Sequence, residues 1–464
     1  MVKKLKTLRN KSLQCGDRKH VPMPTGPFRI IGFRDIMTGF TKKGGVLVRL
    51  YYPAADQTKT IEEQHLYWPN WLPQEAYGRG YGEVATIRWE PLFRFVQRLN
   101  GDTFIPAIPN AKPYREKEGQ PFPTIIFSHG VGGCRTLYSG ICLEMASHGF
   151  IVAAVEHRDN TACLSFYAKQ IRYSMKESNP NFFANEVDGL CEDEPDFGDE
   201  IDDPNYVPPK ALAAVVSVPH IAMEWVRYRH HPIEKTSRKI YAFRNKQIHH
   251  RVRECSRALD LLEALQAGYE LNNILDPLFN IAEFEGLIDL DKAVVMGHSM
   301  GGATAVMSAA VEMRFKVAVC LDAWMYPIKD EGFDLVTQPI LFVNTDNCIE
   351  MAANFEKMKE LIVSSANPVE PSAEGSAPEA RKAVTIRGSA HFNQTDTPFV
   401  FNWFTKLFMR RFKTNSKRNK FTAHDLTNYL ALSFISQQLD ITIDEDVERY
   451  LNEQKKKIKP SFKK

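Results

Sequence analysis

The 464-residue sequence lacks the run of roughly 18 uncharged apolar residues that a membrane-spanning helix needs. It also lacks any Cys-x-x-Cys pair, so its eight scattered cysteines suggest neither a zinc site nor a dense disulfide framework. Neither sign of charge dominates, because 59 basic and 56 acidic residues leave a formal net charge of +3. We therefore expect free thiols in a reducing compartment, no metal site and no general attraction to nucleic acid.

The two ends of the sequence carry little apolar character. Residues 1–26 have no hydrophobic core of a secretory signal, and Val2 stands where N-myristoylation requires glycine. We expect a flexible N-terminal segment, a cytoplasmic location and contact with membranes only at their surface. Residues 441–464 are expected to form a basic C-terminal tail, whose last part, 455–464, is frayed and adds weak attraction to anionic lipid.

Short apolar runs rich in β-formers recur along the chain, and most are followed by apolar residues at helical spacing. This alternation is typical of a mostly parallel central sheet flanked by helices, so we predict one α/β domain over 27–440. The expected strands are 46–52, 124–127, 151–156, 293–296, 317–321, 340–344 and 383–386, and the expected helices are 137–148, 301–310, 351–363 and 399–410.

Two stretches interrupt this pattern and are expected to be insertions. The first, 167–225, contains a dense acidic run without the glycine and glutamate placement of a calcium-binding loop, which favours a solvated loop over a calcium site. The second, 364–380, is rich in Ser, Pro, Ala and Glu and is expected to be disordered.

The most specific motif is the G-x-S-x-G pentapeptide at 297–301. It follows the expected strand 293–296 and opens a helix rich in small residues. A serine on such a sharp strand-to-helix turn exposes its Oγ above the sheet, and the glycines are needed because larger side chains would collide with neighbouring backbone. The pattern also occurs by chance, but this context indicates a nucleophile elbow with Ser299 as nucleophile.

A serine hydroxyl needs an imidazole to take its proton, and the imidazole needs a carboxylate to fix its tautomer. In α/β-hydrolases both partners follow the serine, in the order acid and then histidine. His391 is the predicted base because it lies just beyond the last expected strand. His424 lies downstream too, but in a helix-like segment with no strand leading to it.

The residue pattern leaves two candidates for the acid. Asp346 ends a strand-like run two strands after the nucleophile, where many α/β-hydrolases place the acid, and Asp322 ends the run before it. Topology alone slightly favours Asp346, and either aspartate could instead cap a loop. Asp330 and Asp334 are poorer candidates because they lie on the following connection.

The oxyanion hole is predicted to consist of two backbone N–H groups. One is that of Met300, directly after the nucleophile, and the other is that of Val131 in the glycine-rich loop 129–133. His129 and His298 flank these positions, and we expect each to hold the local backbone rather than to act in catalysis.

These motifs resemble the platelet-activating-factor acetylhydrolases of the plasma and type II intracellular kind. The resemblance implies an α/β-hydrolase fold with insertions and calcium-independent phospholipase activity. In that family the acid sits in a Leu-Asp-Ala-Trp motif, which implies Asp322 rather than Asp346. The similar stretches are 49–53, 127–130, 135–139, 146–159, 297–304, 321–325 and 385–391.

A candidate lipid-interface helix spans 87–99. It places Trp89, Leu92, Phe93 and Val96 at helical spacing with arginines beside them. An apolar stripe more often packs against a core, but the family resemblance implies a lipid-facing helix in this region. We therefore predict peripheral contact with a membrane or a lipid particle.

The motifs and the resemblance together predict a serine esterase that hydrolyses the sn-2 acetyl, short or oxidised acyl ester of phospholipids such as platelet-activating factor. The predicted catalytic residues are Ser299, Asp322 and His391, without a metal or organic cofactor. The alternatives are a carboxylesterase of the same fold acting on soluble esters and a non-catalytic lipid-binding protein. The sequence does not indicate an oligomeric state, an acyl-length limit or a head-group preference.

Overall fold

A sheet of ten strands organises the computed structural model, which describes residues 18–85, 102–116, 119–170, 221–230, 237–328, 330–346, 352–363, 380–401 and 416–462. Across the sheet the strand order is β14-β13-β12-β11-β10-β6-β7-β3-β2-β5. The strands are β2 (Ile31–Met37), β3 (Leu47–Pro53), β5 (Ile108–Pro109), β6 (Phe122–Ser128), β7 (Ile151–Val155), β10 (Ile288–His298), β11 (Phe315–Leu321), β12 (Ile340–Thr345), β13 (Arg381–Ile386) and β14 (Ile458–Pro460).

The sheet is mostly parallel, as predicted. Strands β7, β6, β10, β11, β12 and β13 run parallel to one another, whereas β3 is antiparallel to both of its neighbours and β14 is antiparallel to β13. All seven expected strands are present, as β3, β6, β7, β10, β11, β12 and β13. Their near-continuous apolar character follows from burial on both faces of the sheet.

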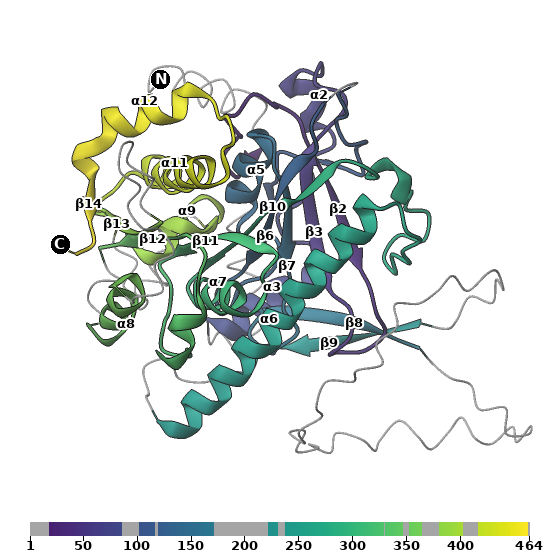
Figure 1. The fold of residues 1–464 in the computed structure, drawn as a ribbon. Coiled ribbons are helices and arrows are strands. Elements are labelled where there is room, and N and C mark those ends of the chain that lie inside the picture. The colour runs from purple at the N-terminus through teal and green to yellow at the C-terminus, as the bar shows by residue number, and fades with distance from the viewer. Residues whose placement is uncertain are drawn as a thin grey trace, which may run out of the picture.

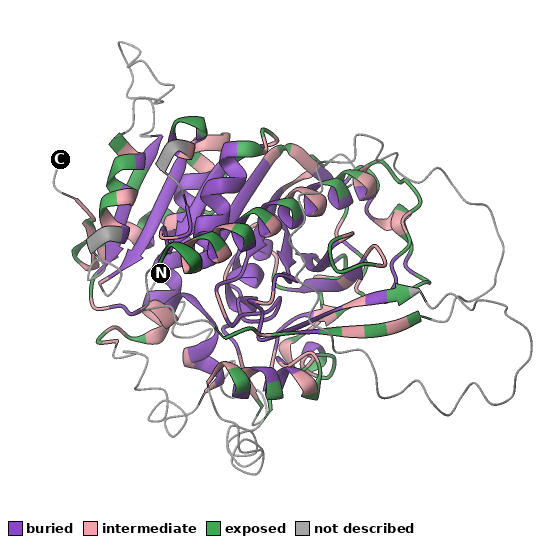
Figure 2. Cartoon of the chain, turned by 90° about the horizontal axis from the view of Figure 1, so that it is seen from below, coloured by how far each residue is buried: buried purple, intermediate pink, exposed green. Residues whose placement is uncertain are grey.

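Helices cover both faces of the sheet (Figure 1). In β10, Val294 and Met296 pack with the helices of one face, whereas Ala293 and Val295 pack with those of the other. Figure 2 shows the resulting layers, with buried residues on the strands and exposed residues on the outer sides of the helices. One face carries α5 (Ser139–Ser147), α11 (Lys420–Leu439) and α12 (Glu445–Gln454), and the other carries α6 (Arg238–Gln266), α7 (Met300–Val311) and α8 (Ala352–Val363).

Three of the four expected helices are present, as α5, α7 and α8. The fourth, expected at 399–410, differs because the short helix α9 (Thr397–Val400) begins earlier, with proline in its first turn, and Phe401 is already extended. Residues 402–415 lie outside the described residues. The 29-residue helix α6 was not predicted, because buried charged residues at Arg244, Arg251 and Glu254 interrupt its apolar pattern.

The C-terminal segment differs from the expected frayed tail. Helix α12 buries Val447 and Tyr450, Asp444 caps its N-terminus, and β14 pairs with β13 to form one edge of the sheet. The domain therefore continues well past residue 440. The expectation was wrong because the many lysines of this segment suggested a solvated tail, whereas its apolar residues face the core.

The N-terminal boundary also differs from the expectation of a flexible segment over residues 1–26. Residues 1–17 lie outside the described residues, but β1 (Lys19–His20) pairs with β4 (Thr103–Phe104), and Val21 is fully buried. Gly26 lies so close to α5 that a Cβ atom there would be 2.3 Å from the Ser147 carbonyl oxygen. The core therefore begins before residue 27.

The expected insertion at 167–225 overlaps an antiparallel ribbon of β8 (Leu164–Gln170) and β9 (Ile221–Arg227) at both of its ends (Figure 1). Residues 171–220 between these strands lie outside the described residues, as do 364–379 of the second expected insertion. The predicted lipid-interface residues Trp89, Leu92, Phe93 and Val96 also lie outside the described residues. Among the helices that are described, none has both the length and the apolarity needed to cross a bilayer.

Candidate active site

Ser299 lies on the turn between β10 and α7. Its backbone has φ 57° and ψ −118°, a strained conformation that the surrounding structure must hold. A Cβ atom at Gly297 would lie 2.2 Å from the Gly301 carbonyl oxygen, and one at Gly301 would lie 2.0 Å from the Ser128 carbonyl oxygen. Only glycine fits at both positions, which is the geometric reason for the G-x-S-x-G pattern.

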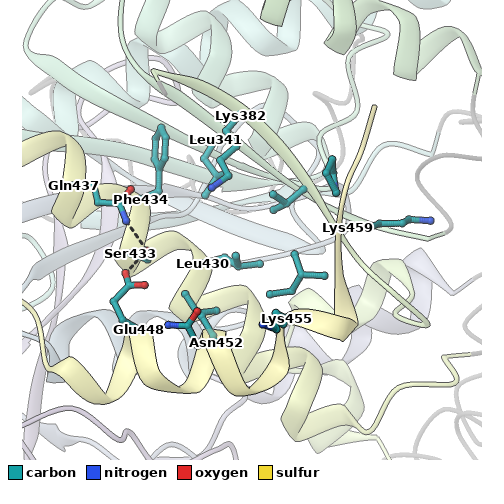
Figure 3. Close-up of a pocket in the computed structure, with 14 residues that line it drawn as sticks. Leu341, Lys382, Leu430, Ser433, Phe434, Gln437, Glu448, Asn452, Lys455 and Lys459 are labelled. Atoms are coloured by element: carbon teal, nitrogen blue, oxygen red, sulfur yellow. Dashed lines mark hydrogen bonds between the residues drawn. The ribbon is translucent and has the colours of Figure 1, made fainter. Parts of the chain in front are cut away.

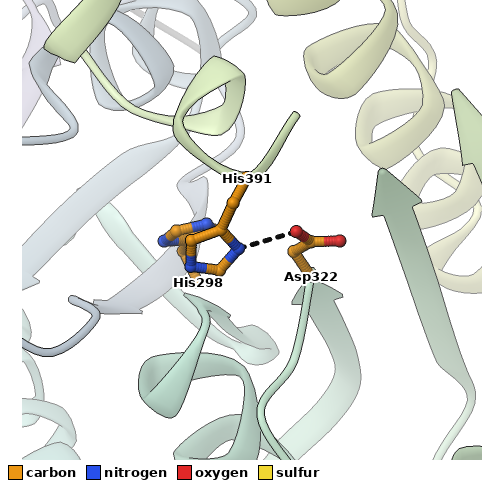
Figure 4. A group of neighbouring side chains, drawn as sticks. All are labelled: His298, Asp322 and His391. Atoms are coloured by element: carbon orange, nitrogen blue, oxygen red, sulfur yellow. Dashed lines mark hydrogen bonds and ion pairs between the residues drawn. The ribbon is translucent and has the colours of Figure 1, made fainter. Parts of the chain in front are cut away.

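His391 and Asp322 come together at the same end of the sheet. The Nδ1 atom of His391 lies 2.7 Å from Oδ2 of Asp322, and the ring lies between Asp322 and His298 (Figure 4). Asp322 directly follows β11 and is buried, whereas the side chain of His391 is 37% exposed. The imidazole can therefore meet a substrate while its carboxylate partner is shielded from water.

Asp322 is held in place by the end of the neighbouring strand. The N–H and hydroxyl of Thr345 donate hydrogen bonds of 2.7 and 2.8 Å to its two carboxylate oxygens. Burial by itself would raise the pKa of Asp322, but the hydrogen bonds from His391 and Thr345 bring it below its ordinary value. Asp322 is therefore an anion that can stabilise a positive charge on His391.

Asp346, which topology alone had slightly favoured as the acid, has other partners. Its carboxylate accepts a hydrogen bond from the N–H of Gly388 and lies 3.1 Å from the ammonium of Lys459. Asp346 thus links the loop before His391 to β14. This geometry favours Asp322 as the orienting carboxylate and gives Asp346 a structural role.

The two amides predicted for the oxyanion hole lack internal partners. Within the described part of the chain, neither Val131 nor Met300 donates its N–H to a hydrogen-bond acceptor. The neighbouring amides are satisfied, because Gly130 donates to the hydroxyl of Tyr138 and Gly132 donates to the carbonyl of Thr161. Two free N–H groups near the nucleophile are what a developing oxyanion requires.

His298 connects the turn at Ser299 to the glycine-rich loop 129–133, the predicted oxyanion loop. Its Nδ1 lies 2.8 Å from the hydroxyl of Tyr138, which also accepts the N–H of Gly130, and its ring centroid lies 4.3 Å from that of His391. Burial lowers the pKa of His298 well below its ordinary value, so this ring is neutral at physiological pH. Sequence reasoning missed Tyr138, because an aromatic residue at a helix start gives no sign of a distant polar partner.

His298, Asp322 and His391 also offer donor atoms within 4.8 Å of one another, as a metal site would. Most of these atoms already have partners, however. Nδ1 of His391 faces Asp322, Nδ1 of His298 faces Tyr138, and both oxygens of Asp322 accept hydrogen bonds from Thr345. The arrangement fits proton transfer better than metal binding.

Buried charged residues of helix α6 hold the predicted oxyanion loop in place. The guanidinium of Arg251 donates a hydrogen bond of 2.6 Å to the carbonyl of His129 and pairs with Asp159 at 2.8 Å. Glu254, three residues after Arg251 in the helix, accepts a hydrogen bond of 2.7 Å from Nδ1 of His157. The sequence did not predict this role for α6, because the partners lie about 100 residues away.

Asp396 fixes the other end of the His391 loop. Its carboxyl group is fully buried and accepts hydrogen bonds from the N–H groups of Ser139 and Gly140, at the start of α5, and from the indole of Trp71. Complete burial raises the pKa of Asp396 to about 8, despite these three donors. Asp396 therefore ties the loop that carries His391 to the helix that follows the oxyanion loop.

This buried carboxyl predicts a pH-dependent stability. Folded Asp396 keeps its proton up to a pH of about 8, whereas an exposed aspartate in the unfolded chain loses it near pH 4. The folded state binds more protons between these values, so Asp396 makes the free energy of unfolding fall as pH rises through them. Urea unfolding at about pH 5 and about pH 8 should show a smaller fall in Asp396→Asn than in the parent protein. Equal pH dependence in the two proteins would contradict the assignment.

A separate cavity lies near the far edge of the sheet. It has a volume of about 340 Å³ and lies among α11, α12 and the strands β12 to β14, with Lys382, Lys455 and Lys459 among its lining residues (Figure 3). Neither Ser299, Asp322 nor His391 lines it. It is therefore distinct from the candidate active site.

Comparisons with known proteins identify the family. Residues 14–458 match the family described as platelet-activating factor acetylhydrolase, isoform II. The chain is 32% identical over 427 residues to the platelet-activating factor acetylhydrolase of Gallus gallus, covering 92% of this chain and 85% of that one, and 30% identical over 426 residues to that of Bos taurus, covering 92% and 79%.

Two more distant similarities are to a putative phospholipase and to a solved structure that shares the fold. A putative phospholipase A2 of Schizosaccharomyces pombe is 24% identical over 415 residues, covering 84% of this chain and 83% of that one. A ferulic acid esterase from Streptomyces cinnamoneus shares the fold with a TM-score of 0.50 at 16% identity, over 93% of this chain and 96% of that one. The predicted α/β-hydrolase fold is thereby confirmed, and the chain belongs to the platelet-activating factor acetylhydrolase, isoform II, family.

Proposed function

We propose that this protein is a serine esterase that hydrolyses the sn-2 acetyl, short or oxidised acyl ester of phospholipids such as platelet-activating factor. The observation that carries the proposal is the 2.7 Å hydrogen bond between His391 and Asp322 at the sheet end where Ser299 occupies its strained turn. Membership of the acetylhydrolase family supports the choice of a phospholipid ester over other acyl compounds.

In the proposed first step, the Oγ atom of Ser299 attacks the ester carbonyl carbon. The Nε2 atom of His391 takes the hydroxyl proton, and Asp322 stabilises the imidazolium through its hydrogen bond to Nδ1. The carbonyl oxygen becomes negative and accepts hydrogen bonds from the N–H groups of Val131 and Met300. These donors interact with the transition state more strongly than with the substrate, which lowers the barrier.

In the second step, the tetrahedral intermediate collapses and the bond to the glycerol oxygen breaks. The imidazolium of His391 gives its proton to that oxygen, so that a lysophospholipid leaves and the acyl group stays on Ser299. A water molecule then attacks the acyl-enzyme while His391 takes its proton, the bond between the acyl group and Oγ of Ser299 breaks, and His391 returns the proton to Oγ as the carboxylic acid leaves. No step requires a metal ion.

The proposal includes a cytoplasmic protein that meets its substrate at the surface of a membrane or lipid particle. The five cysteines for which the structure gives a state are free and buried, which is compatible with a reducing compartment. The lipid-interface role of Trp89, Leu92, Phe93 and Val96 remains part of the proposal, since these residues lie outside the described residues.

A substrate comparison in the presence of a chelator tests the proposed activity. We expect hydrolysis of acetyl and short sn-2 phospholipids to persist in EDTA, because the proposed chemistry uses only backbone donors and side chains. We also expect it to exceed the hydrolysis of long-chain phospholipids. Release of the acyl group from each lipid and from a water-soluble acetyl ester is the measurement. Loss of activity in EDTA, or a preference for the soluble ester, would contradict the proposal.

The two alternative functions predict different results in the same experiments. A carboxylesterase of the same fold would prefer the soluble ester. A non-catalytic lipid-binding protein would hydrolyse none of these compounds and would not be labelled covalently by an organophosphate, whereas an activated serine is labelled.

A further inference from the structure

Six basic residues gather where β13 leads into the loop that carries His391. The N–H of Arg387 donates to the carbonyl of Lys457 at 2.8 Å, and the guanidinium of Arg418 donates to the carbonyl of Arg387 at 2.8 and 2.6 Å. The N–H of Arg418 also donates to the carbonyl of Gly388 at 2.8 Å. We call this group the C-terminal basic surface, and its members are Arg387, Lys417, Arg418, Lys455, Lys456 and Lys457.

No acidic side chain among the described residues forms an ion pair with these cations. In the described part of the chain, none of the six has a carboxylate within ion-pairing distance. Partial burial and, to a smaller extent, the charge of Arg418 lower the pKa of Lys457. Asp346 also contacts this loop, but Lys459 and the N–H of Gly388 engage its carboxylate.

Charge is unevenly distributed along α12. Acidic residues occupy the first turn of the helix, at Glu445, Asp446 and Glu448, whereas the lysines follow its last turn. The C-terminal end of a helix dipole is negative and stabilises such lysines. Figure 3 shows Lys455 at this end of the helix, beside the strand that carries Lys459.

The C-terminal basic surface lies at the same end of the sheet as the candidate active site. Ser299 and Asp322 follow the carboxyl ends of β10 and β11, which run parallel to β12 and β13. Strand β14 is antiparallel to β13 and begins with Ile458 opposite Ile386, so Lys455 to Lys457 precede it at that same end. A planar anionic surface that meets these lysines would therefore face the end of the sheet that carries Ser299 and Asp322.

We propose that the C-terminal basic surface binds the head groups of anionic phospholipids in a bilayer and thereby holds the active-site end of the sheet against the membrane. The choice of a lipid surface rests on the proposed function, because a phospholipid esterase must take its substrate from lipid. Exposed Lys and Arg near an anionic leaflet increase partitioning by about fivefold per charge. Four of the six residues, Arg387, Lys417, Lys455 and Lys456, are exposed, and such charges can retain the protein without any inserted apolar segment.

Sedimentation with lipid vesicles tests this proposal without turnover. We compare vesicles of phosphatidylcholine alone with vesicles that also contain phosphatidylserine, using the full chain and the triple variant Lys417→Gln, Lys455→Gln, Lys456→Gln. All three lysines are exposed, so their replacement should leave the fold intact. The matched control removes the same charge from the opposite end of the sheet, by Lys112→Gln, Lys292→Gln, Lys316→Gln.

The parent protein should prefer vesicles with phosphatidylserine, and the triple variant should lose about a hundredfold in that partitioning, with the control close to the parent. Raising the ionic strength should weaken binding of the parent, because salt screens exposed charges. Equal binding by the triple variant and the control, no preference for phosphatidylserine, or tighter binding of duplex DNA than of vesicles through the same lysines would each overturn the proposal. Because the experiment measures binding and not hydrolysis, its result can be interpreted even if the esterase assignment fails.

Discussion

Replacement of Ser299 by alanine is expected to lower kcat for ester hydrolysis by about 10⁶-fold. The change removes the nucleophilic Oγ, and without it His391 and Asp322 have no hydroxyl to activate. The two backbone amides would still polarise the carbonyl, so a small activity above the uncatalysed rate is expected to remain. Single-turnover release of acetate from platelet-activating factor is the measurement.

A control in the same helix separates catalysis from folding. Ser308 lies in α7 and is buried, so Ser308→Ala reports on the packing of that helix without touching the nucleophile turn. We expect this variant to retain activity and organophosphate labelling, and Ser299→Ala to lose both while unfolding at a similar urea concentration. Activity that survives in Ser299→Ala would rule out the proposed mechanism.

Replacement of Asp322 by asparagine is expected to lower kcat by about 10⁴-fold. An amide in this position carries no charge to stabilise the imidazolium and permits the wrong tautomer of His391. The free energy of unfolding should also fall, because the N–H and hydroxyl of Thr345 both donate to the carboxylate. The second measurement is the pH dependence of kcat, which should differ from that of the parent protein because His391 loses the anion that orients it.

Asp346→Asn is the matched comparison for Asp322→Asn. Both residues follow neighbouring strands of the sheet, but Asp346 pairs with Lys459 and accepts from Gly388 instead of His391. We expect Asp346→Asn to keep most of its activity and to lose some stability at the junction of β13 and β14. An inactive Asp346→Asn beside an active Asp322→Asn would transfer the role of the acid to Asp346.

Local sequence was sufficient to predict the nucleophile turn and the central sheet. The glycines at 297 and 301 are required because a side chain at either position would collide with backbone, and this constraint acts within a few residues of Ser299. The strands were predictable because burial on both faces makes their central positions mostly apolar, a property that each strand carries by itself. The position of His391 was predictable for a similar reason, since it lies a few residues beyond the end of β13.

Features that depend on distant partners were not predictable from local pattern. Helix α6 was missed because its buried Arg251 and Glu254 look like surface charges until their partners, about 100 residues away, are known. The C-terminal segment looked like a solvated tail, because its pairing with β13 is a contact between segments some 70 residues apart. Asp396 gave no sequence signal, since its donors belong to α5 and to Trp71.

The sequence by itself determined the fold class, the nucleophile turn and a short set of candidate partners for Ser299. The residue pattern left Asp322 and Asp346 open and the family resemblance implied Asp322, but only the tertiary structure shows a physical reason, because both aspartates follow buried strands and differ in which loop reaches them. The ring of His391 meets Asp322, whereas the ammonium of Lys459, delivered by β14, meets Asp346. The choice depends on how the ends of β11, β12 and β13 are placed in space, which no local pattern encodes.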